Sequence, residues 1–212
     1  MSPRAQTGGV PDGARSKDKI LAAAAQLAKE RGLHGATIAA VSQRSGLPAS
    51  SIYWHFSDKD ALFAEVIRTS FAQWLGTVPQ WTAPDAATLH EGLQSILGAS
   101  TRTLRDVPDF LRIGMQVLLD QHDEHASARE AFLAIRSQTA AMITAYVRQA
   151  LGPDSDRTLA EDLATLVITF SEGLLVGSQV YADWDPDEYL EVFLGMFDHA
   201  ASSRAQSASR AG

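Results

Sequence analysis

Apolar residues recur every three to four positions along most of the chain, which is the spacing of amphipathic α-helices. In the first such stretch, from about Ser16 to Arg31, the apolar positions are Ile20, Ala23, Ala24, Leu27 and Ala28. Ser16 is the expected N-cap of this helix, and Gly32 is its expected end. No stretch alternates apolar and polar residues as a half-buried strand does. The pattern therefore predicts an all-α fold.

Residues 37–59, TIAAVSQRSGLPASSIYWHFSDK, combine several helix boundary signals within a short distance. Thr37 is the expected cap of a helix over 38–45, which Gly46 can end by adopting a positive φ. Pro48 suits the first turn of a second short helix over 49–55. Ser57 is the expected cap of the next helix, with Asp60 three residues later in the manner of a capping box. Two short helices joined by a glycine turn are typical of a helix-turn-helix.

The remaining helices are separated by breaks rich in proline and glycine at 77–85 and 152–154. They are expected at about 59–76, 86–105, 107–120, 126–151, 156–182 and 187–202. Residues 1–15 and 203–212 are small and polar, and we expect both to be flexible tails. The predicted organisation is a three-helix domain over 16–62 followed by a larger helical domain over 63–202.

Composition limits the location and the chemistry of the protein. The chain has 212 residues and no cysteine, which excludes disulfides, thiolate metal sites and cysteine nucleophiles. The first residues lack the apolar core of a signal peptide. The longest apolar run, 163–182, is interrupted by polar residues, and we interpret it as a buried helix instead of a membrane span. We therefore expect a cytoplasmic protein that makes no membrane contact.

Charge is distributed unevenly along the chain. Residues 1–62 contain eight Lys and Arg against five Asp and Glu, whereas 63–212 contain ten against twenty, which together give the net charge of −7. The N-terminal third thus carries the positive sign that contacts with DNA phosphates require, and the acidic remainder would be repelled by DNA.

The helix over 49–55 has an unusual composition, because it carries hydroxyl, phenol, indole and imidazole groups and no acid. Such a helix can present donors and ring faces to DNA. Aromatic residues in a short helix are more often part of a core. Ile52 and Phe56, four residues apart, already supply a buried stripe here, which leaves Tyr53 and Trp54 for the exposed side.

The order and spacing of these residues resemble the tetracycline-repressor (TetR) family of transcription regulators. The resemblance covers about residues 17–64, and it includes Glu30-Arg31-Gly32, Ser45-Gly46-Leu47, Tyr53-Trp54-His55-Phe56 and Ser57-Asp58-Lys59. It implies a DNA-binding regulator that is not an enzyme and needs no cofactor. The implied protein is a homodimeric repressor released from a palindromic double-stranded operator by a small-molecule effector. The alternatives are a regulator without a ligand, an activator, and a small-molecule binder or enzyme that has kept the helix-turn-helix.

The resemblance also implies which residues contact DNA. They are Thr37, Arg44, Ala49, Ser50, Ser51, Tyr53, Trp54, His55 and Lys59. Thr37, Tyr53, His55 and Lys59 are expected to hold phosphates, and Arg44 to contact a base or a phosphate. The chain departs from the family at Pro48-Ala49, where a side-chain cap and a basic residue are often found. The cap and one positive charge are therefore lost there, and Ala49 can offer DNA only an apolar contact, for instance to a thymine methyl.

The second domain matches the family only in layout, as a ligand-binding and dimerisation unit. By region, the expected ligand-binding residues are Trp74, Phe110, Met115, Leu118, Phe132 and Arg136. The expected dimer contacts are Phe170, Gly173, Leu174 and Gly177, in a four-helix interface that the 126–151 helix completes. Both sets have the alternative interpretation of core residues within one chain.

One cluster of possible metal ligands occurs over 120–125, DQHDEH. His122 and His125, three residues apart, could share a helical face. The cluster lies where a helix is expected to end, and acidic turns are common, so we interpret it as a solvated turn without a metal. His34, in the turn after the first helix, is likewise expected to be a solvated loop residue.

Overall fold

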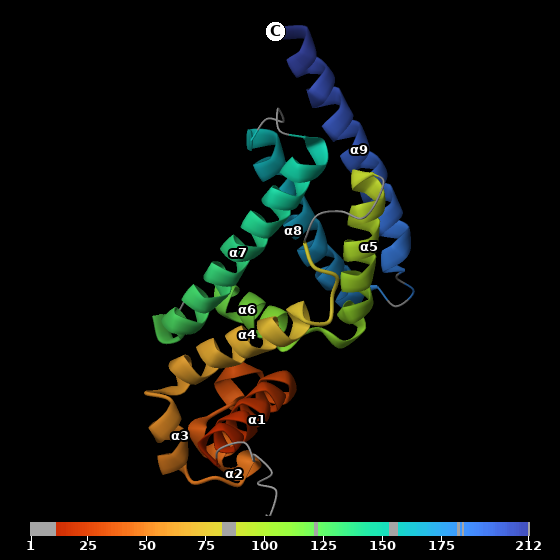
Figure 1. Cartoon of the computed structure of the whole chain (residues 1–212). Coiled ribbons are helices and arrows are strands. Elements are labelled where there is room, and N and C mark those ends of the chain that lie inside the picture. The colour runs from red at the N-terminus through yellow and green to blue at the C-terminus, as the bar shows by residue number, and fades with distance from the viewer. Residues whose placement is uncertain are drawn as a thin grey trace, which may run out of the picture. The chain divides into compact units, whose positions relative to one another are not determined.

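The computed structural model of the chain describes residues 12–81, 88–120, 123–152, 157–181, 183 and 185–211. Over these residues the chain is all-α, as the apolar periodicity predicts. The α-helices are α1 (Asp12–Gly35), α2 (Ile38–Ser45), α3 (Ala49–His55), α4 (Lys59–Leu75), α5 (Leu89–Arg102), α6 (Asp109–Leu119), α7 (Ala126–Leu151), α8 (Arg157–Val180) and α9 (Pro186–Ala211) (Figure 1). Two 3-10 helices, η1 (Thr103–Asp106) and η2 (Asp123–His125), precede α6 and α7.

Several predicted boundaries need correction at the ends of the chain. Helix α1 begins at Asp12, so Ser16 lies inside the helix and is not its cap, and the last residues of the predicted N-terminal tail are helical. Gly32 has φ 68° and ψ 175° and interrupts α1 where the sequence predicts its end. Helix α9 continues to Ala211 and so includes most of the predicted C-terminal tail. Residues 1–11 of the N-terminal tail lie outside the described residues.

The chain divides into two compact units. The first holds residues 1–70 and 109–132, and the second holds 71–108 and 133–212. The predicted boundary at 62 lies within α4, and both α4 and α7 contribute residues to both units.

The first unit is built on α1, which packs against α2, α3 and α6. Its core contains fully buried apolar side chains from α1 to α4, namely Ile20, Leu27, Val41, Ile52, Leu62 and Phe63. Helices α6 and α7 are in close contact at Gly114, because a Cβ at this position would overlap the ring of Phe132. A glycine therefore lets α6 reach the buried face of α7.

The second unit has a core formed by α5, α7, α8 and α9. Its buried residues include Leu93, Ile143, Val147, Leu163 and Leu194. The rings of Phe170 and Phe193 stack between α8 and α9, with centroids 4.0 Å apart and planes at 7°. Among the described helices, α8 is long and apolar enough to cross a membrane by length and composition, but the buried residues of its first half are part of this core.

Candidate nucleic-acid interface

The turn between α2 and α3 has the geometry that its sequence predicts. The Thr37 hydroxyl accepts a hydrogen bond from the Ala40 backbone N–H (3.2 Å) and caps α2. Gly46 adopts φ 70° and ψ 14° at the C-terminal end of α2, a conformation that glycine takes without steric cost. The Ser42 hydroxyl donates to the Leu47 carbonyl (2.7 Å) and so fixes the path of the chain toward α3.

Helix α3 buries its apolar stripe and exposes its aromatic residues. Ile52 is fully buried and Phe56 nearly so, whereas Tyr53 is 56% exposed and Trp54 is 77% exposed. The core interpretation of Tyr53 and Trp54 is therefore wrong for this structure. Exposing two large rings on one short helix is unfavourable in water, which favours a partner surface for them.

The other predicted contact residues on α3 are less accessible than the aromatic pair. Ser50 is exposed, whereas Ala49, Ser51 and His55 are half-buried. The imidazole of His55 meets the Trp54 ring edge to face, with centroids 4.5 Å apart. Pro48 precedes α3 in an extended conformation and provides no side-chain cap, as its sequence position predicts.

Arg44 is bound to the protein itself. Its guanidinium donates to both carboxylate oxygens of Glu30 on α1, at 3.0 and 2.7 Å. The hydrogen bonds from Arg44 hold the pKa of Glu30 below its ordinary value, and those to Glu30 raise the pKa of Arg44. A planar guanidinium engaged at both oxygens joins α2 to α1. DNA contact by Arg44 would require this ion pair to break.

Lys59 opens α4 beside the apolar ring of Phe63, with the ammonium 6.0 Å from the ring centroid. The side chain is half-buried. Burial lowers the pKa of Lys59, while the nearby carboxylate of Glu124 acts in the opposite direction. Lys59 is thus positioned at a helix start, as expected, and Glu124 is an acidic neighbour that the sequence did not reveal.

The start of α4 is capped by a different residue from the predicted one. Asp58 accepts from the Ala61 backbone N–H (2.7 Å), and the Ser57 hydroxyl donates to Asp58 (3.0 Å), so Asp58 is the cap and Ser57 supports it. The backbone hydrogen bond from Ala61, followed by that from Ser57, keeps the pKa of Asp58 below its ordinary value. The predicted capping box is therefore wrong.

Asp60 caps another helix altogether. Its two carboxylate oxygens accept from the backbone N–H groups of Ser127 (2.7 Å) and Ala128 (3.0 Å), in the first turn of α7. An acid at this position also has the favourable sign for the N-terminal end of a helix dipole. These two hydrogen bonds join the beginning of α4 to the beginning of α7 within the first unit.

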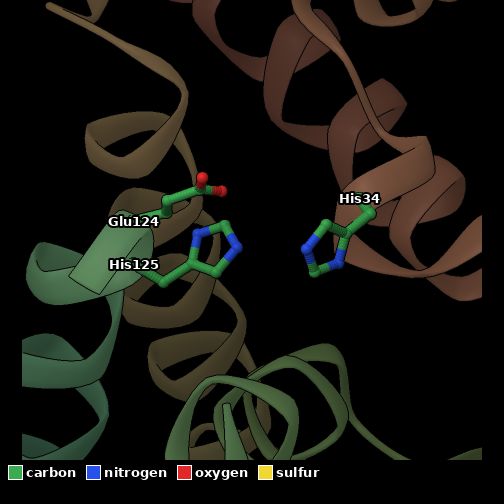
Figure 2. Close-up of side chains that lie close together, drawn as sticks. All are labelled: His34, Glu124 and His125. Carbon is green, nitrogen blue, oxygen red and sulfur yellow. The ribbon is translucent and has the colours of Figure 1, made fainter. Parts of the chain in front are cut away.

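The acidic turn before α7 is not simply solvated. His125 is only 4% exposed, which corrects the interpretation of this residue as a solvated one. It lies near Glu124 and near His34 of α1 (Figure 2). His122 falls outside the described residues, so its predicted relation to His125 has no counterpart here.

The six predicted ligand-binding residues are divided between the two units. Phe110, Met115, Leu118 and Phe132 belong to the first unit, where Phe110 and Phe132 are core residues. Trp74 and Arg136 belong to the second unit. The Trp74 indole donates to the Thr103 hydroxyl (3.1 Å), and Arg136 forms an ion pair with Glu172 of α8.

The predicted dimer residues also fall into two groups. Phe170 packs on Phe193 of its own chain and so contributes to the core of the second unit, and Leu174 is buried. Gly173 is exposed with open space beside it, and Gly177 is half-buried.

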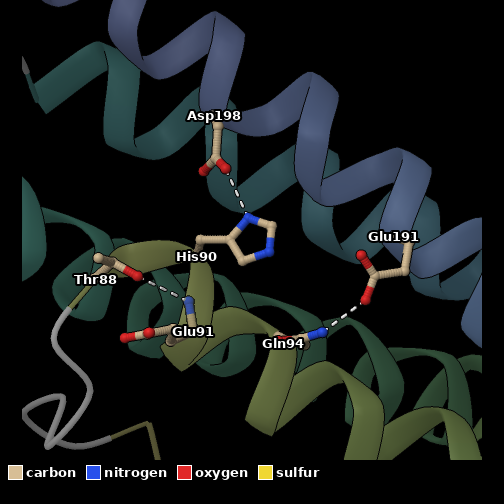
Figure 3. A network of polar contacts seen from close by, with 6 residues as sticks. All are labelled: Thr88, His90, Glu91, Gln94, Glu191 and Asp198. Atoms are coloured by element: carbon tan, nitrogen blue, oxygen red, sulfur yellow. Dashed lines mark hydrogen bonds and ion pairs between the residues drawn. The ribbon is translucent and has the colours of Figure 1, made fainter.

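Helix α9 is attached to α5 by polar contacts (Figure 3). His90 lies 2.6 Å from the Asp198 carboxylate, and Gln94 donates to Glu191 (2.6 Å). Thr88 caps α5 by accepting from the Glu91 N–H (3.2 Å). These contacts fix one side of α9 and leave the other side with its apolar residues exposed.

A helix-turn-helix with two exposed aromatic residues on its second helix defines a DNA-binding module. Residues 20–66 match the family model described as bacterial regulatory proteins, tetR family. The chain is 34% identical over 62 residues to the HTH-type transcriptional repressor KstR2 of Mycolicibacterium smegmatis, a match that covers 29% of this chain and 30% of that protein. Over these residues the chain is similar to the TetR family of transcriptional regulators.

Solved structures resemble the fold over most of the chain. A transcriptional regulator from Rhodococcus sp. Rha1 superimposes with a TM-score of 0.65 at 23% identity, covering 91% of this chain and 97% of that one. NalD of Pseudomonas aeruginosa, a secondary repressor of the MexAB-OprM multidrug efflux pump, gives a TM-score of 0.61 at 20% identity, covering 90% and 97%. At these identities the likeness supports the helical architecture alone.

Proposed function

We propose that the protein is a homodimeric transcriptional repressor that acts in the cytoplasm and binds a palindromic operator through α2 and α3. The observation that carries the proposal is the exposure of Tyr53 and Trp54 on a helix whose opposite side is fully buried. The relative KstR2, which is named as a repressor, supports the sign of regulation.

Within this proposal, phosphates are held by Thr37, Tyr53, His55 and Lys59, which lie on α3 or at the starts of α2 and α4. A lysine at a helix start offers a point charge, and helix N-terminal N–H groups attract anions. Ala49, Ser50, Ser51 and Trp54 form the edge that reads bases. Serine can pair with several bases, so this edge discriminates weakly at the serines.

Arg44 is a positioning residue in this proposal, because its guanidinium is engaged by Glu30. The pair joins α2 to α1 and so orients the helix-turn-helix. Loss of Arg44 should therefore misplace α2 and α3 and weaken the affinity of the protein for every DNA sequence. The base preference at each operator position should stay the same.

Dimerisation is proposed through α8 and α9. Exposed apolar residues recur at helical spacing along both helices, at Leu166, Val176, Val180, Tyr189, Val192 and Met196. Gly173 adds a position without a side chain to this side of α8, where another helix could approach closely. These features favour α9 over α7 as the partner of α8 in a four-helix interface. A dimer would place two α3 helices on successive major grooves, about 34 Å apart.

Release from the operator is proposed to follow binding of a small-molecule effector by the second unit. Trp74 and Arg136 are the two predicted ligand residues of that unit. The effector would act by binding more tightly to a form of the dimer whose α3 helices no longer match the operator spacing.

The experiment that tests the proposal is selection of bound sequences from random double-stranded DNA, followed by transcription from the selected site with and without the protein. A palindrome that the protein silences is expected. Enrichment of an unpaired half-site would refute the dimeric operator, activation of transcription would refute repression, and no enrichment at all would refute DNA binding. Repeating the selection with libraries of small molecules tests release by an effector.

A further inference from the structure

A histidine with no hydrogen-bond partner is buried in the first unit. His125 is 4% exposed, and neither of its ring nitrogens has a partner within the part of the chain that the structure describes. A buried imidazole almost always has a partner for at least one nitrogen, because the ring loses its water on burial. This side chain therefore requires an explanation that the helix-turn-helix does not supply.

Two further metal-ligating side chains lie beside His125. The imidazole of His34 and the carboxylate of Glu124 each offer an atom, and the three ligand atoms all lie within 4.8 Å of one another. The two imidazole rings are 6.0 Å apart at their centroids and nearly perpendicular. Figure 2 shows a nitrogen of His125 and a nitrogen of His34 facing each other across a gap, with the Glu124 carboxylate on the His125 side.

We propose that His34, Glu124 and His125 bind a divalent first-row transition metal ion such as Zn²⁺. Two imidazoles and one carboxylate form a set that such ions prefer, whereas Mg²⁺ and Ca²⁺ prefer oxygen ligands alone. Three protein ligands leave a fourth position for water or another ligand.

The spacing of the three groups is close to that of a bound site. Ligand atoms around a tetrahedral zinc ion at about 2.0–2.1 Å lie about 3.3 Å from one another. The observed limit of 4.8 Å requires a contraction of at most about 1.5 Å. His34 and Glu124 are exposed and can change rotamer, so this contraction needs no movement of the buried His125.

The scaffold holds two of the ligands in place. Glu124 and His125 are the last residues of η2, directly before the first turn of α7 that Asp60 caps. His34 follows the break at Gly32, and its neighbour Leu33 is buried, which anchors this end of α1. A metal ion would therefore join the end of α1 to the start of α7 within the first unit. The exposed ligands give the ion a path from solvent.

The test is calorimetric titration of the full chain, free of any histidine tag and first treated with a chelator, with ZnCl₂. We expect one zinc ion per chain and a zinc-dependent rise in the unfolding temperature. His34→Gln and Glu124→Gln, which alter exposed side chains, should each weaken zinc binding at least about tenfold and abolish the rise. Co²⁺ in place of Zn²⁺ should give the strong visible absorption of a four-coordinate site.

Two control variants identify the ligands. His199→Gln removes an exposed imidazole on α9, and His122→Gln removes the histidine nearest to His125 in sequence that is not in the proposed set. Both should retain wild-type zinc affinity. The proposal is overturned if zinc does not bind, if His34→Gln and Glu124→Gln bind as well as the wild type, or if His122→Gln loses binding while His34→Gln keeps it.

Discussion

Substitution of Gly114 by alanine tests how tightly α6 and α7 pack in the first unit. Two effects oppose each other. Alanine is favoured over glycine inside a helix by about 1 kcal/mol. The new Cβ would overlap three atoms of the Phe132 ring, and Phe132 is fully buried, so the ring cannot turn out into solvent without losing its burial. Overpacking of this kind costs about 1–3 kcal/mol or more.

The clash should exceed the gain in helix propensity, so that Gly114→Ala destabilises the chain by about 1–2 kcal/mol. For a chain of this size, that loss corresponds to a decrease in Tm of about 2–8 °C. Urea and thermal unfolding followed by circular dichroism would measure both quantities. A variant as stable as the wild type, or more stable, would refute the packing argument.

Gly98→Ala in α5 is the matched control. Its Cβ would meet Arg102 and Leu190 at 3.8 Å, an ordinary contact distance, so this variant should gain up to about 1 kcal/mol. A second check is Phe132→Leu, which removes the ring that causes the overlap. The double variant Gly114→Ala/Phe132→Leu should lose less stability than the sum of the two single losses, which a double-mutant cycle would measure.

Four further predictions concern the α4 region and the DNA interface. Lys59→Ala should weaken binding to all DNA sequences and reduce the slope of log affinity against log salt by about 1, measured by fluorescence anisotropy. Ser51→Ala should change the preference among operator variants; an equal loss on every variant would place Ser51 among the phosphate contacts. Asp60→Ala should reduce the free energy of unfolding by about 1 kcal/mol or more, because two N–H groups of α7 lose their acceptor, whereas unchanged urea unfolding would contradict this role. The pKa of Asp58 is lower in the folded chain than in the unfolded chain, so ionised Asp58 stabilises the fold at pH values above its unfolded pKa of about 3.9. This stabilisation is lost as the pH falls through the folded pKa. Asp58→Asn should therefore flatten the pH dependence of the free energy of unfolding below about pH 4.

The parts of the structure that the sequence predicts accurately depend on local signals. Thr37, Gly46 and Pro48 each determine the backbone within one turn of their own position, and α2 and α3 have the predicted bounds. The interval between Ile52 and Phe56 identifies the buried side of α3 without knowledge of any other helix. The family resemblance adds the function of this surface, which local signals cannot supply.

The features that the sequence does not predict are contacts between distant residues. Asp60 has the spacing of a local capping box, but its oxygens accept from residues 67 and 68 positions further along the chain. Arg44 and Glu30 are 14 positions apart, and either could have faced solvent. Nothing in the spacing of His34 and His125 indicates that the fold brings them together.

The second unit illustrates a different limit. Helix α8 is apolar on more than one side, so its sequence cannot distinguish residues that pack within the chain from those that remain exposed. The fold makes this distinction, because Leu174 is buried while Val176 and Val180 are exposed. Helix α9, which the sequence shows only as amphipathic, extends the exposed apolar side through Val192 and Met196.

The junction at Asp60 also bears on how an effector could influence DNA binding. Helices α4 and α7 both begin in the first unit and continue into the second, so each can transmit a displacement along its own backbone. Their beginnings are hydrogen-bonded to each other through Asp60, and Lys59 is the adjacent residue. A displacement that reaches the start of either helix must therefore move the other or break these two hydrogen bonds. For this reason we expect α7, together with α4, to connect an effector site to the proposed phosphate contact at Lys59, which α4 carries.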